Sequence, residues 1–199
     1  QEAWLQGVPF YVDERVIVPR SLIAELLVDG SIDYWLKEST HCVLDLCTGN
    51  GSLGILAAMV YPDVAVTGAD ISEDALAVAR INVDKHQLQD RITYAADAYQ
   101  ALTGADALLL NYAHDITRSP VAVANLLGQV RPGGRVAMAG MRFFPWWTGP
   151  LNLLAWLKNR PYNARAADLW SPWDLVQARC LDFERWTTQA GMGYIARGR

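Results

Sequence analysis

A glycine-rich segment that begins with a carboxylate is the strongest chemical signal in this 199-residue sequence. Residues 45–54 read Asp-Leu-Cys-Thr-Gly-Asn-Gly-Ser-Leu-Gly. Glycine permits a sharp turn and lets a ligand approach the backbone, and the helix predicted after it should offer free N–H groups at its start. Gly49, Gly51 and Gly54 also fit the Gly-x-Gly-x-x-Gly spacing of dinucleotide-binding loops, which is weak evidence by itself.

Three carboxylates indicate what kind of ligand the loop would bind. Asp45 ends the strand before the loop, where it would repel a diphosphate and attract an ammonium or sulfonium group. Asp70 ends the next strand, where an acidic side chain can accept hydrogen bonds from both ribose hydroxyls. Asp97 follows the third strand, and we expect it beside the amine of an adenine. Because these strand ends meet at one edge of a parallel sheet, the three acids predict a cationic nucleoside ligand.

These residues need strands that alternate with helices, and the hydrophobic pattern predicts that arrangement. Short apolar or β-branched segments predict strands at 41–46, 64–70, 91–95, 107–111, 136–139, 183–188 and 192–197. Helical spacing predicts helices at 21–36, 52–60, 72–86, 119–130, 151–158 and from 172 onward. The alternation is typical of an α/β fold with a doubly wound, mostly parallel sheet that ends in a hairpin.

The composition predicts a single folded domain over residues 1–199. Hydrophobic residues make up 52% and the net charge is −4, which argues against a disordered chain and against a nucleic-acid partner. The sequence has no membrane-spanning apolar stretch and no signal-peptide pattern at its start. Cys42, Cys47 and Cys180 follow no disulfide or metal-binding spacing, so we expect a reducing, cytoplasmic setting and no metal site.

The first half of the sequence carries three extended motifs. They are Phe-Tyr-Val-Asp-Glu-Arg-Val-Ile-Val-Pro-Arg-Ser at 10–21, Val-Leu-Asp-Leu-Cys-Thr-Gly-Asn-Gly-Ser at 43–52 and Ala-Asp-Ile-Ser-Glu-Asp-Ala-Leu-Ala-Val-Ala-Arg at 69–80. Through these motifs, residues 8–97 resemble the catalytic domain of the bacterial protein-(glutamine-N5) methyltransferases, in the branch that modifies a large-subunit ribosomal protein.

The resemblance implies a class I, Rossmann-like methyltransferase fold with seven strands, the last of them antiparallel. It also implies S-adenosyl-L-methionine as the cofactor and S-adenosyl-L-homocysteine as the product. On this resemblance the cofactor-binding residues are Asp45, Thr48, Gly49, Gly51, Asp70, Ile71, Asp97 and Asn111.

The sequence departs from this family after the fourth strand. The family has Asn-Pro-Pro-Tyr there, in which the Asn and the prolyl backbone hold the glutamine amide, whereas this chain has Asn111-Tyr112-Ala113-His114. Because an amide is a weak nucleophile that needs such positioning, the change argues against glutamine-N5 methylation. Asn111 and His114 are the candidate catalytic residues, with His114 as a general base or, alternatively, as part of the pocket rim.

The second half of the sequence resembles a different group. Through the segments at 111–120, 132–140, 144–147 and 193–198, residues 106–199 resemble a little-characterised group of class I methyltransferases of the small-molecule type. Residues 1–100 carry 6 basic and 15 acidic side chains, whereas residues 101–199 carry 11 and 6. We therefore predict a join near 97–106 between a cofactor-binding half (41–100, after a helix-and-loop lead-in at 1–40) and a half that closes the sheet (101–199).

Other functions stay open at this point. A chimera of two methyltransferases, natural or engineered, would keep the fold and the cofactor site without catalysing a reaction. An NAD-dependent oxidoreductase would share the glycines and Asp70, but the sequence has no Tyr-x-x-x-Lys pair. The aromatic segment at 143–147 would either wall the acceptor pocket or pack on the sheet. The sequence leaves the methyl acceptor and the oligomeric state open.

Overall fold

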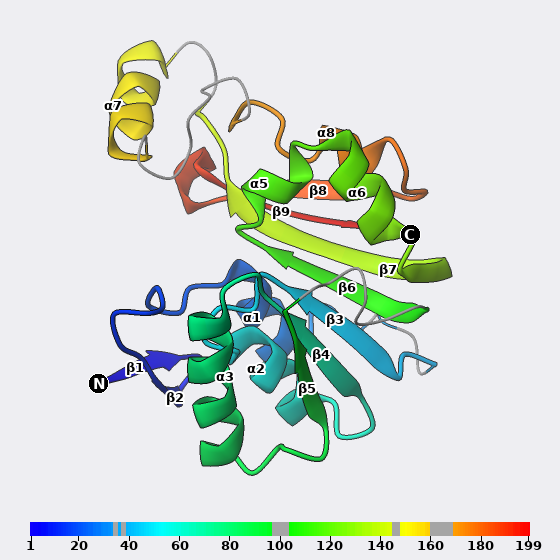
Figure 1. The fold of residues 1–199 in the computed structure, drawn as a ribbon. Coiled ribbons are helices and arrows are strands. Elements are labelled where there is room, and N and C mark those ends of the chain that lie inside the picture. The colour runs from blue at the N-terminus through cyan, green and yellow to red at the C-terminus, as the bar shows by residue number, and fades with distance from the viewer. Residues whose placement is uncertain (34–35, 37–38, 97–103, 145–147, 160–168) are drawn as a thin grey trace.

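Seven strands form one sheet in the order β5-β4-β3-β6-β7-β9-β8. The computed structural model describes the whole chain except residues 34–35, 37–38, 97–103, 145–147 and 160–168 (Figure 1). The first five strands of this order pair in parallel, whereas β9 runs antiparallel to both of its neighbours. The predicted α/β fold, with a mostly parallel seven-stranded sheet and an antiparallel last strand, is confirmed. The strands are β3 (Cys42–Leu46), β4 (Ala65–Ala69), β5 (Ile92–Ala95), β6 (Ala105–Asn111), β7 (Val130–Met141), β8 (Glu184–Thr188) and β9 (Gly193–Gly198).

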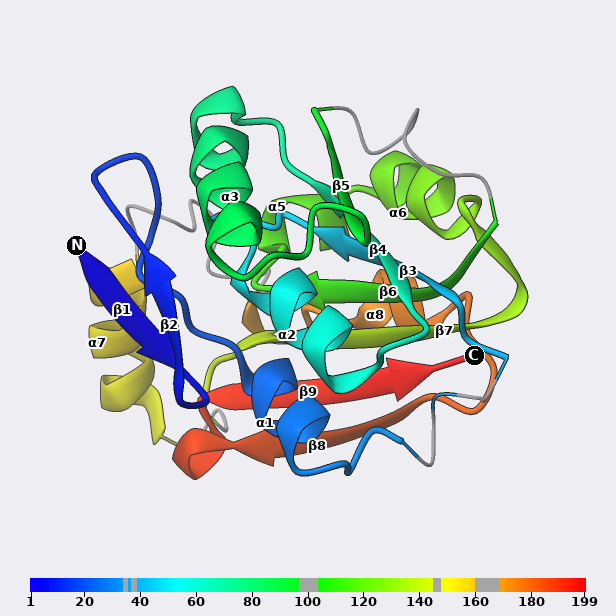
Figure 2. The same cartoon turned by 90° about the horizontal axis from the view of Figure 1, so that it is seen from below.

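Helices cover both faces of the sheet (Figure 2). One face carries α1 (Leu22–Val28), α2 (Ser52–Val60) and α3 (Glu73–Lys85), and the other carries α5 (His114–Thr117), α6 (Pro120–Leu127) and α8 (Asp174–Gln177). The remaining described helices are α7 (Gly149–Asn159) and the short 3-10 turn η3 (Gln189–Gly191). No described helix is long and apolar enough to cross a membrane.

The core lies on both sides of the sheet because neighbouring strand residues point to opposite faces. Val43 and Leu109 pack with α1 and α2, whereas Leu44 and Leu108 pack with α6 and α8. Burial on both faces explains why the central strands are almost continuously apolar.

The N-terminal segment differs from the predicted helix and loop. Strands β1 (Glu2–Leu5) and β2 (Val8–Tyr11) form an antiparallel hairpin. Its turn residues, Gln6 and Gly7, have φ of 50° and 77°, as a type I′ turn requires. The helix predicted at 21–36 ends at Val28, because the chain turns at Gly30 with φ of 74°. The apolar spacing continues beyond this point because Ile32 packs into the core from a turn.

Strand pairing brings three chain segments to one edge of the sheet. Leu46, near the carboxyl end of β3, pairs with Ala69 on β4 and with Leu110 on β6. The residues that follow these partners, Asp70 and Asn111, therefore emerge beside the loop that follows β3. This edge is where open α/β sheets bind ligands.

Candidate functional site

Asp45 places a buried charge at the centre of this edge. The residue is 1% exposed, and its Oδ2 accepts hydrogen bonds from the Thr48 hydroxyl at 2.6 Å and from the Gly54 N–H at 3.1 Å. Burial raises the pKa of Asp45 to about 6, although the two hydrogen bonds oppose the rise. Because the ionised form is disfavoured without a cation, the pocket favours a positively charged group near Asp45.

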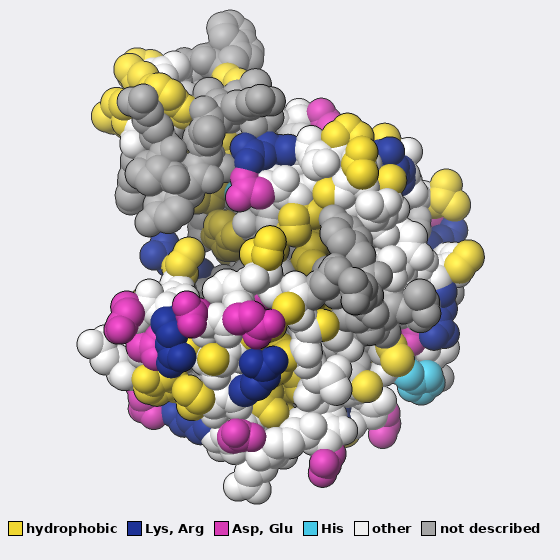
Figure 3. All heavy atoms as spheres, viewed as in Figure 1, with side chains coloured by type: hydrophobic (Ala, Val, Ile, Leu, Met, Phe, Trp, Pro, Cys, Tyr) yellow, Lys and Arg dark blue, Asp and Glu magenta, His cyan; other side chains and the backbone are white. Residues whose placement is uncertain are grey.

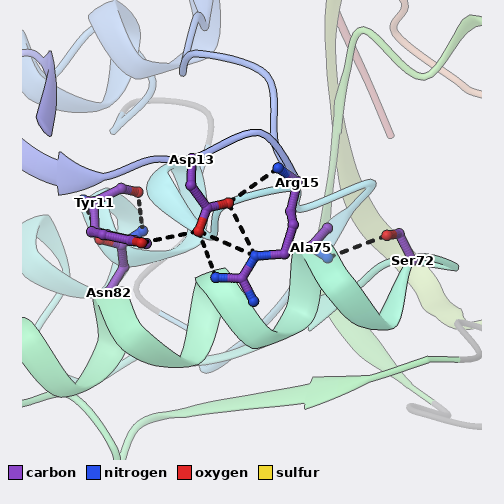
Figure 4. Close-up of polar contacts among 6 residues, drawn as sticks. All are labelled: Tyr11, Asp13, Arg15, Ser72, Ala75 and Asn82. Carbon is purple, nitrogen blue, oxygen red and sulfur yellow. Dashed lines mark hydrogen bonds and ion pairs between the residues drawn. The ribbon is translucent and has the colours of Figure 1, made fainter. Parts of the chain in front are cut away.

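Asp70 connects the glycine loop to the neighbouring strand and helix. Its Oδ2 accepts the Gly49 N–H at 2.9 Å, and its Oδ1 accepts the Ser72 N–H at 3.0 Å. Ser72 in turn caps α3 by accepting the Ala75 N–H at 3.2 Å (Figure 4). Each carboxylate oxygen keeps a second lone pair, so Asp70 can still accept hydrogen bonds from ligand hydroxyls.

The loop has fewer free N–H groups than the sequence predicts. Protein oxygens already accept the N–H groups of Gly49, Gly51, Ser52 and Gly54. Two of these acceptors are the carboxylates of Asp45 and Asp70. The expectation of a free helix start is therefore wrong for these positions. A diphosphate needs such groups to be free, so this loop is poorly suited to an anionic ligand.

The outer side of the loop is open and negatively charged. A Cβ built on Gly49 would come no nearer than 4.0 Å to another group, and Ile71 is 94% exposed beside Asp70. Reduced hydration, followed by the negative charges of Asp70, Asp45 and Asp115, raises the pKa of the Cys47 thiol to about 12. The hollow floored by hydrophobic side chains in Figure 3 lies at this edge, between α3 and α5.

Tyr94 supports the loop from β5 and was not predicted as a site residue. A Cβ on Gly68 would lie 2.5 Å from the Tyr94 ring, and one on Gly51 would collide with its hydroxyl. The two glycines therefore leave space for this ring between β4 and the loop. The available signal was Gly68 itself, since a glycine inside a strand often marks a close approach.

Asn82 on α3 is a second residue that the sequence reasoning missed. It is fully buried, and its Nδ2 donates to the carbonyl of Asn50 at 2.9 Å and to that of Tyr11 at 3.0 Å. Its Oδ1 accepts the Tyr11 N–H at 2.6 Å (Figure 4). Asp13 accepts hydrogen bonds from the Tyr11 hydroxyl and from Arg15. Asn82 thus joins the N-terminal hairpin, α3 and the glycine loop.

Asn111 reaches the same edge from the end of β6. Its Nδ2 donates to the Arg20 carbonyl at 2.9 Å, which places the loop before α1 at the site. Its Oδ1 is buried and has no hydrogen-bond partner within the described part of the chain. An unpaired buried acceptor costs about 1–3 kcal/mol, which a suitable donor would relieve. Tyr112 follows with φ of 55°, an unfavourable backbone conformation for a residue other than glycine.

His114 is buried at the start of α5, beyond Tyr112. Its Nε2 accepts the Met141 N–H at 3.3 Å, and burial lowers its pKa to about 4. Its ring packs over Gly140, with its centroid 6.4 Å from that of Tyr112 and 6.5 Å from that of Tyr194. Both the hydrogen bond and the low pKa weigh against proton uptake near neutral pH. A catalytic role for His114 stays a prediction.

Other predicted residues fall partly outside the described chain. Asp97 lies outside it, so its contact with an adenine stays a prediction, as do the roles of residues 145–147. Phe143 is buried and donates its N–H to the Leu169 carbonyl at 2.8 Å, which packs the start of this segment onto the fold. Among the described residues, no cluster of three or more His, Cys, Asp or Glu is arranged to hold a metal ion.

Comparison with known proteins agrees with the fold and with the predicted resemblance. Residues 37–178 match the methyltransferase domain family. The ribosomal protein uL3 glutamine methyltransferase of Burkholderia pseudomallei is 54% identical over 104 residues, which are 51% of this chain and 34% of that protein. The chain thus spans about a third of the length of the curated relatives it matches.

Two solved structures show the same fold at low sequence identity. An O-methyltransferase family protein from Burkholderia thailandensis superposes with a TM-score of 0.64 at 17% identity, over 89% of this chain and 58% of that one. The N-methyltransferase NodS from Bradyrhizobium japonicum WM9 superposes with a TM-score of 0.57 at 14% identity, over 89% and 93%.

Replacing Asn82 should weaken the fold where the hairpin meets the loop. We expect Asn82→Ala to lower the free energy of unfolding by about 2–4 kcal/mol, because the backbone groups of Tyr11 and Asn50 lose a buried partner. Urea denaturation measures this change. Asn125→Ala, at an exposed position of α6, is the control and should change stability by less than about 0.5 kcal/mol. Equal stability of the two variants would contradict the role of Asn82.

The raised pKa of Asp45 predicts how stability depends on pH. Between pH 3.8 and about 6, the folded protein keeps a proton that the unfolded chain has released, so stability falls as pH rises through this window. The loss amounts to at most about 3 kcal/mol. We expect ligand-free Asp45→Asn to be more stable than the original protein at pH 8 and to lose that advantage near pH 4. Urea denaturation across this range tests it, and a variant that is less stable at every pH contradicts it.

Proposed function

The chain belongs to the methyltransferase domain family, and from that premise we propose that it is an S-adenosyl-L-methionine-dependent methyltransferase. The observation that carries the proposal is the buried carboxylate of Asp45 beneath a glycine loop whose N–H groups are already engaged. When bound, the cofactor supplies an activated methyl group on a positively charged sulfur.

The residues at the edge fit the separate parts of this cofactor. Asp45 would hold the ammonium group, since burial raises its pKa and a neighbouring cation would favour the ionised carboxylate. Asp70 would accept the ribose hydroxyls with its remaining lone pairs, and Ile71 offers an exposed apolar side chain beside it for the adenine. Gly49 leaves open space on the outer side of the loop. Thr48 contributes indirectly, because its hydroxyl fixes Asp45.

The same features disfavour an NAD-dependent oxidoreductase. The negative charges of Asp45 and Asp70 would repel a diphosphate. Next to burial, these two charges are the largest causes of the raised pKa of the nearby Cys47 thiol. A diphosphate would also find the N–H groups of the loop engaged by protein oxygens.

We propose that the methyl acceptor carries an N–H group that Asn111 orients. Within the described residues, the Oδ1 of Asn111 lacks a hydrogen-bond partner, and an N–H group of the acceptor would supply one. The Burkholderia pseudomallei relative is named as a glutamine methyltransferase, so a glutamine amide is the first acceptor to test. The missing Pro-Pro-Tyr remains an argument against it.

A non-catalytic hybrid of two methyltransferases is the second candidate. The observation that favours it is again the sequence at 111–114, where only Asn111 remains and its Nδ2 already donates to Arg20. Such a protein would bind the cofactor and transfer no methyl group. Binding and turnover must therefore be measured separately.

Calorimetric titration with S-adenosyl-L-homocysteine tests the cofactor site. We expect binding to strengthen as pH rises toward 6 and then to level off, with up to a tenfold change per pH unit below 6, because an ammonium group prefers ionised Asp45. Asp45→Asn should weaken binding at pH 8 by at least about tenfold. Asp115→Asn, an exposed acid nearby, should change it less than about threefold. Protection against thermal unfolding by NAD but not by S-adenosyl-L-homocysteine would refute the assignment of this cofactor.

Methyl transfer to a glutamine-containing peptide, read by mass spectrometry, tests the acceptor. We expect one added methyl group on this peptide and none on a matched peptide with glutamate. Asn111→Ala should lower turnover by about a hundredfold, because the acceptor loses its orientation. Retained cofactor binding without turnover on the glutamine peptide would contradict a glutamine acceptor and favour the hybrid.

A further inference from the structure

A cavity lies at the β8–β9 end of the sheet, several strands away from the glycine loop. It has a volume of about 360 Å³ and is lined by Arg142, Trp173, Arg185, Trp186, Thr187 and Tyr194. Arg185 belongs to β8, the edge strand, whereas Asp45 belongs to β3, and β6, β7 and β9 lie between these two strands. The cavity is therefore distinct from the contacts around Asp45, and the ring of His114, 6.5 Å from that of Tyr194, lies between the two regions.

Two guanidinium groups converge on one aromatic ring in this cavity. The Cζ atom of Arg142 lies 5.5 Å from the centroid of the Trp173 ring, and that of Arg185 lies 4.7 Å from it. Contacts of this kind with an aromatic face stabilise each cation, but they do not neutralise its charge. Two positive charges so close to one ring raise the electrostatic potential in the cavity.

Neither arginine pairs with an acid within the described residues. Arg142 donates its Nε to the Phe143 carbonyl at 3.0 Å, and Arg185 donates its Nη1 to the Gln177 side chain at 2.9 Å. Both acceptors are neutral. Arginines elsewhere in the chain do pair with carboxylates, namely Arg15, Arg118, Arg131, Arg197 and Arg199. The positive charge of the cavity is thus left without a counter-charge from the described protein.

Trp173 is itself a largely buried part of the cavity wall. The residue is 4% exposed, and its Nε1 is buried without a hydrogen-bond partner in the described part of the chain. The two guanidinium groups are donors, so the cavity offers donors for an anionic group. The rings of Trp173, Trp186 and Tyr194 add flat apolar surface around them.

We propose that this cavity binds a small molecule with a carboxylate or phosphate group on a flat aromatic body. The anionic group would lie between Arg142 and Arg185, since guanidinium groups bind both oxyanions through paired hydrogen bonds. The aromatic body would pack against the tryptophan and tyrosine rings. The volume lies at the lower end of the range for small-molecule pockets.

Calorimetric titrations with benzoate, phenyl phosphate and benzamide test the proposal. Benzoate and phenyl phosphate represent the two sources of an oxyanion, and benzamide is the neutral analogue of benzoate. We expect at least one anionic probe to bind and benzamide to bind at least about tenfold more weakly. The stronger anionic probe identifies the group that the site prefers. The titration needs no cofactor, so its outcome is independent of the proposed methyl transfer.

Substitution of Arg142 and Arg185 distinguishes binding of the anionic probe in this cavity from nonspecific binding elsewhere on the protein. We expect Arg142→Gln and Arg185→Gln each to weaken the anionic probe at least about tenfold, with the thermal unfolding temperature recorded to confirm folding. Arg179→Gln is the control, because Arg179 is exposed and donates to the Leu175 carbonyl of α8. The proposal is overturned if neither anion binds, if benzamide binds equally well, or if a folded double variant of Arg142 and Arg185 retains binding.

Discussion

Asp45 carries its charge into the middle of a parallel sheet, and the groups around it limit the cost of that burial. The hydroxyl of Thr48 and the N–H of Gly54 both bind its Oδ2, so the carboxylate fixes the start of the glycine loop and the start of α2 together. Its pKa remains raised because burial outweighs these two hydrogen bonds. The same carboxylate therefore shapes the loop and, when ionised, favours a cationic ligand beside it.

Protein groups from three different elements hold the glycine loop in place. Asp70 binds it from β4, Asn82 binds it from α3, and the ring of Tyr94 packs beneath it from β5. In addition, protein oxygens accept the loop N–H groups of Gly49, Gly51, Ser52 and Gly54, which would otherwise attract phosphate. A glycine-rich loop after a parallel strand is therefore insufficient to identify the ligand, because the partners of its N–H groups decide whether an anion or a cation is favoured.

The sequence predicted structural features correctly where they depend on neighbouring residues along the chain. The strand that carries Asp45 near its end, the helix that begins at Ser72 and the alternation of strands and helices follow from local patterns, and the structure contains all three. Tyr94 and Asn82 were missed because their roles depend on contacts across the fold, to Gly68 in one case and to Tyr11 in the other. The hairpin at β1 and β2 was missed because its strands are four residues each, too short for a clear alternation.

The bond between Tyr11 and Asn82 joins residues 71 positions apart, and it has a consequence for the order of assembly. During synthesis the hairpin leaves the ribosome long before the helix that anchors it, so its backbone partner does not yet exist. Contacts of such long sequence separation form late, because closing the intervening chain is entropically costly. The carbonyl of Asn50, in the glycine loop, also accepts a hydrogen bond from the Asn82 side chain, so this bond cannot form until α3 is present. The glycine loop should therefore reach its final conformation only after α3 has docked, which makes it among the last parts of this half to become ordered.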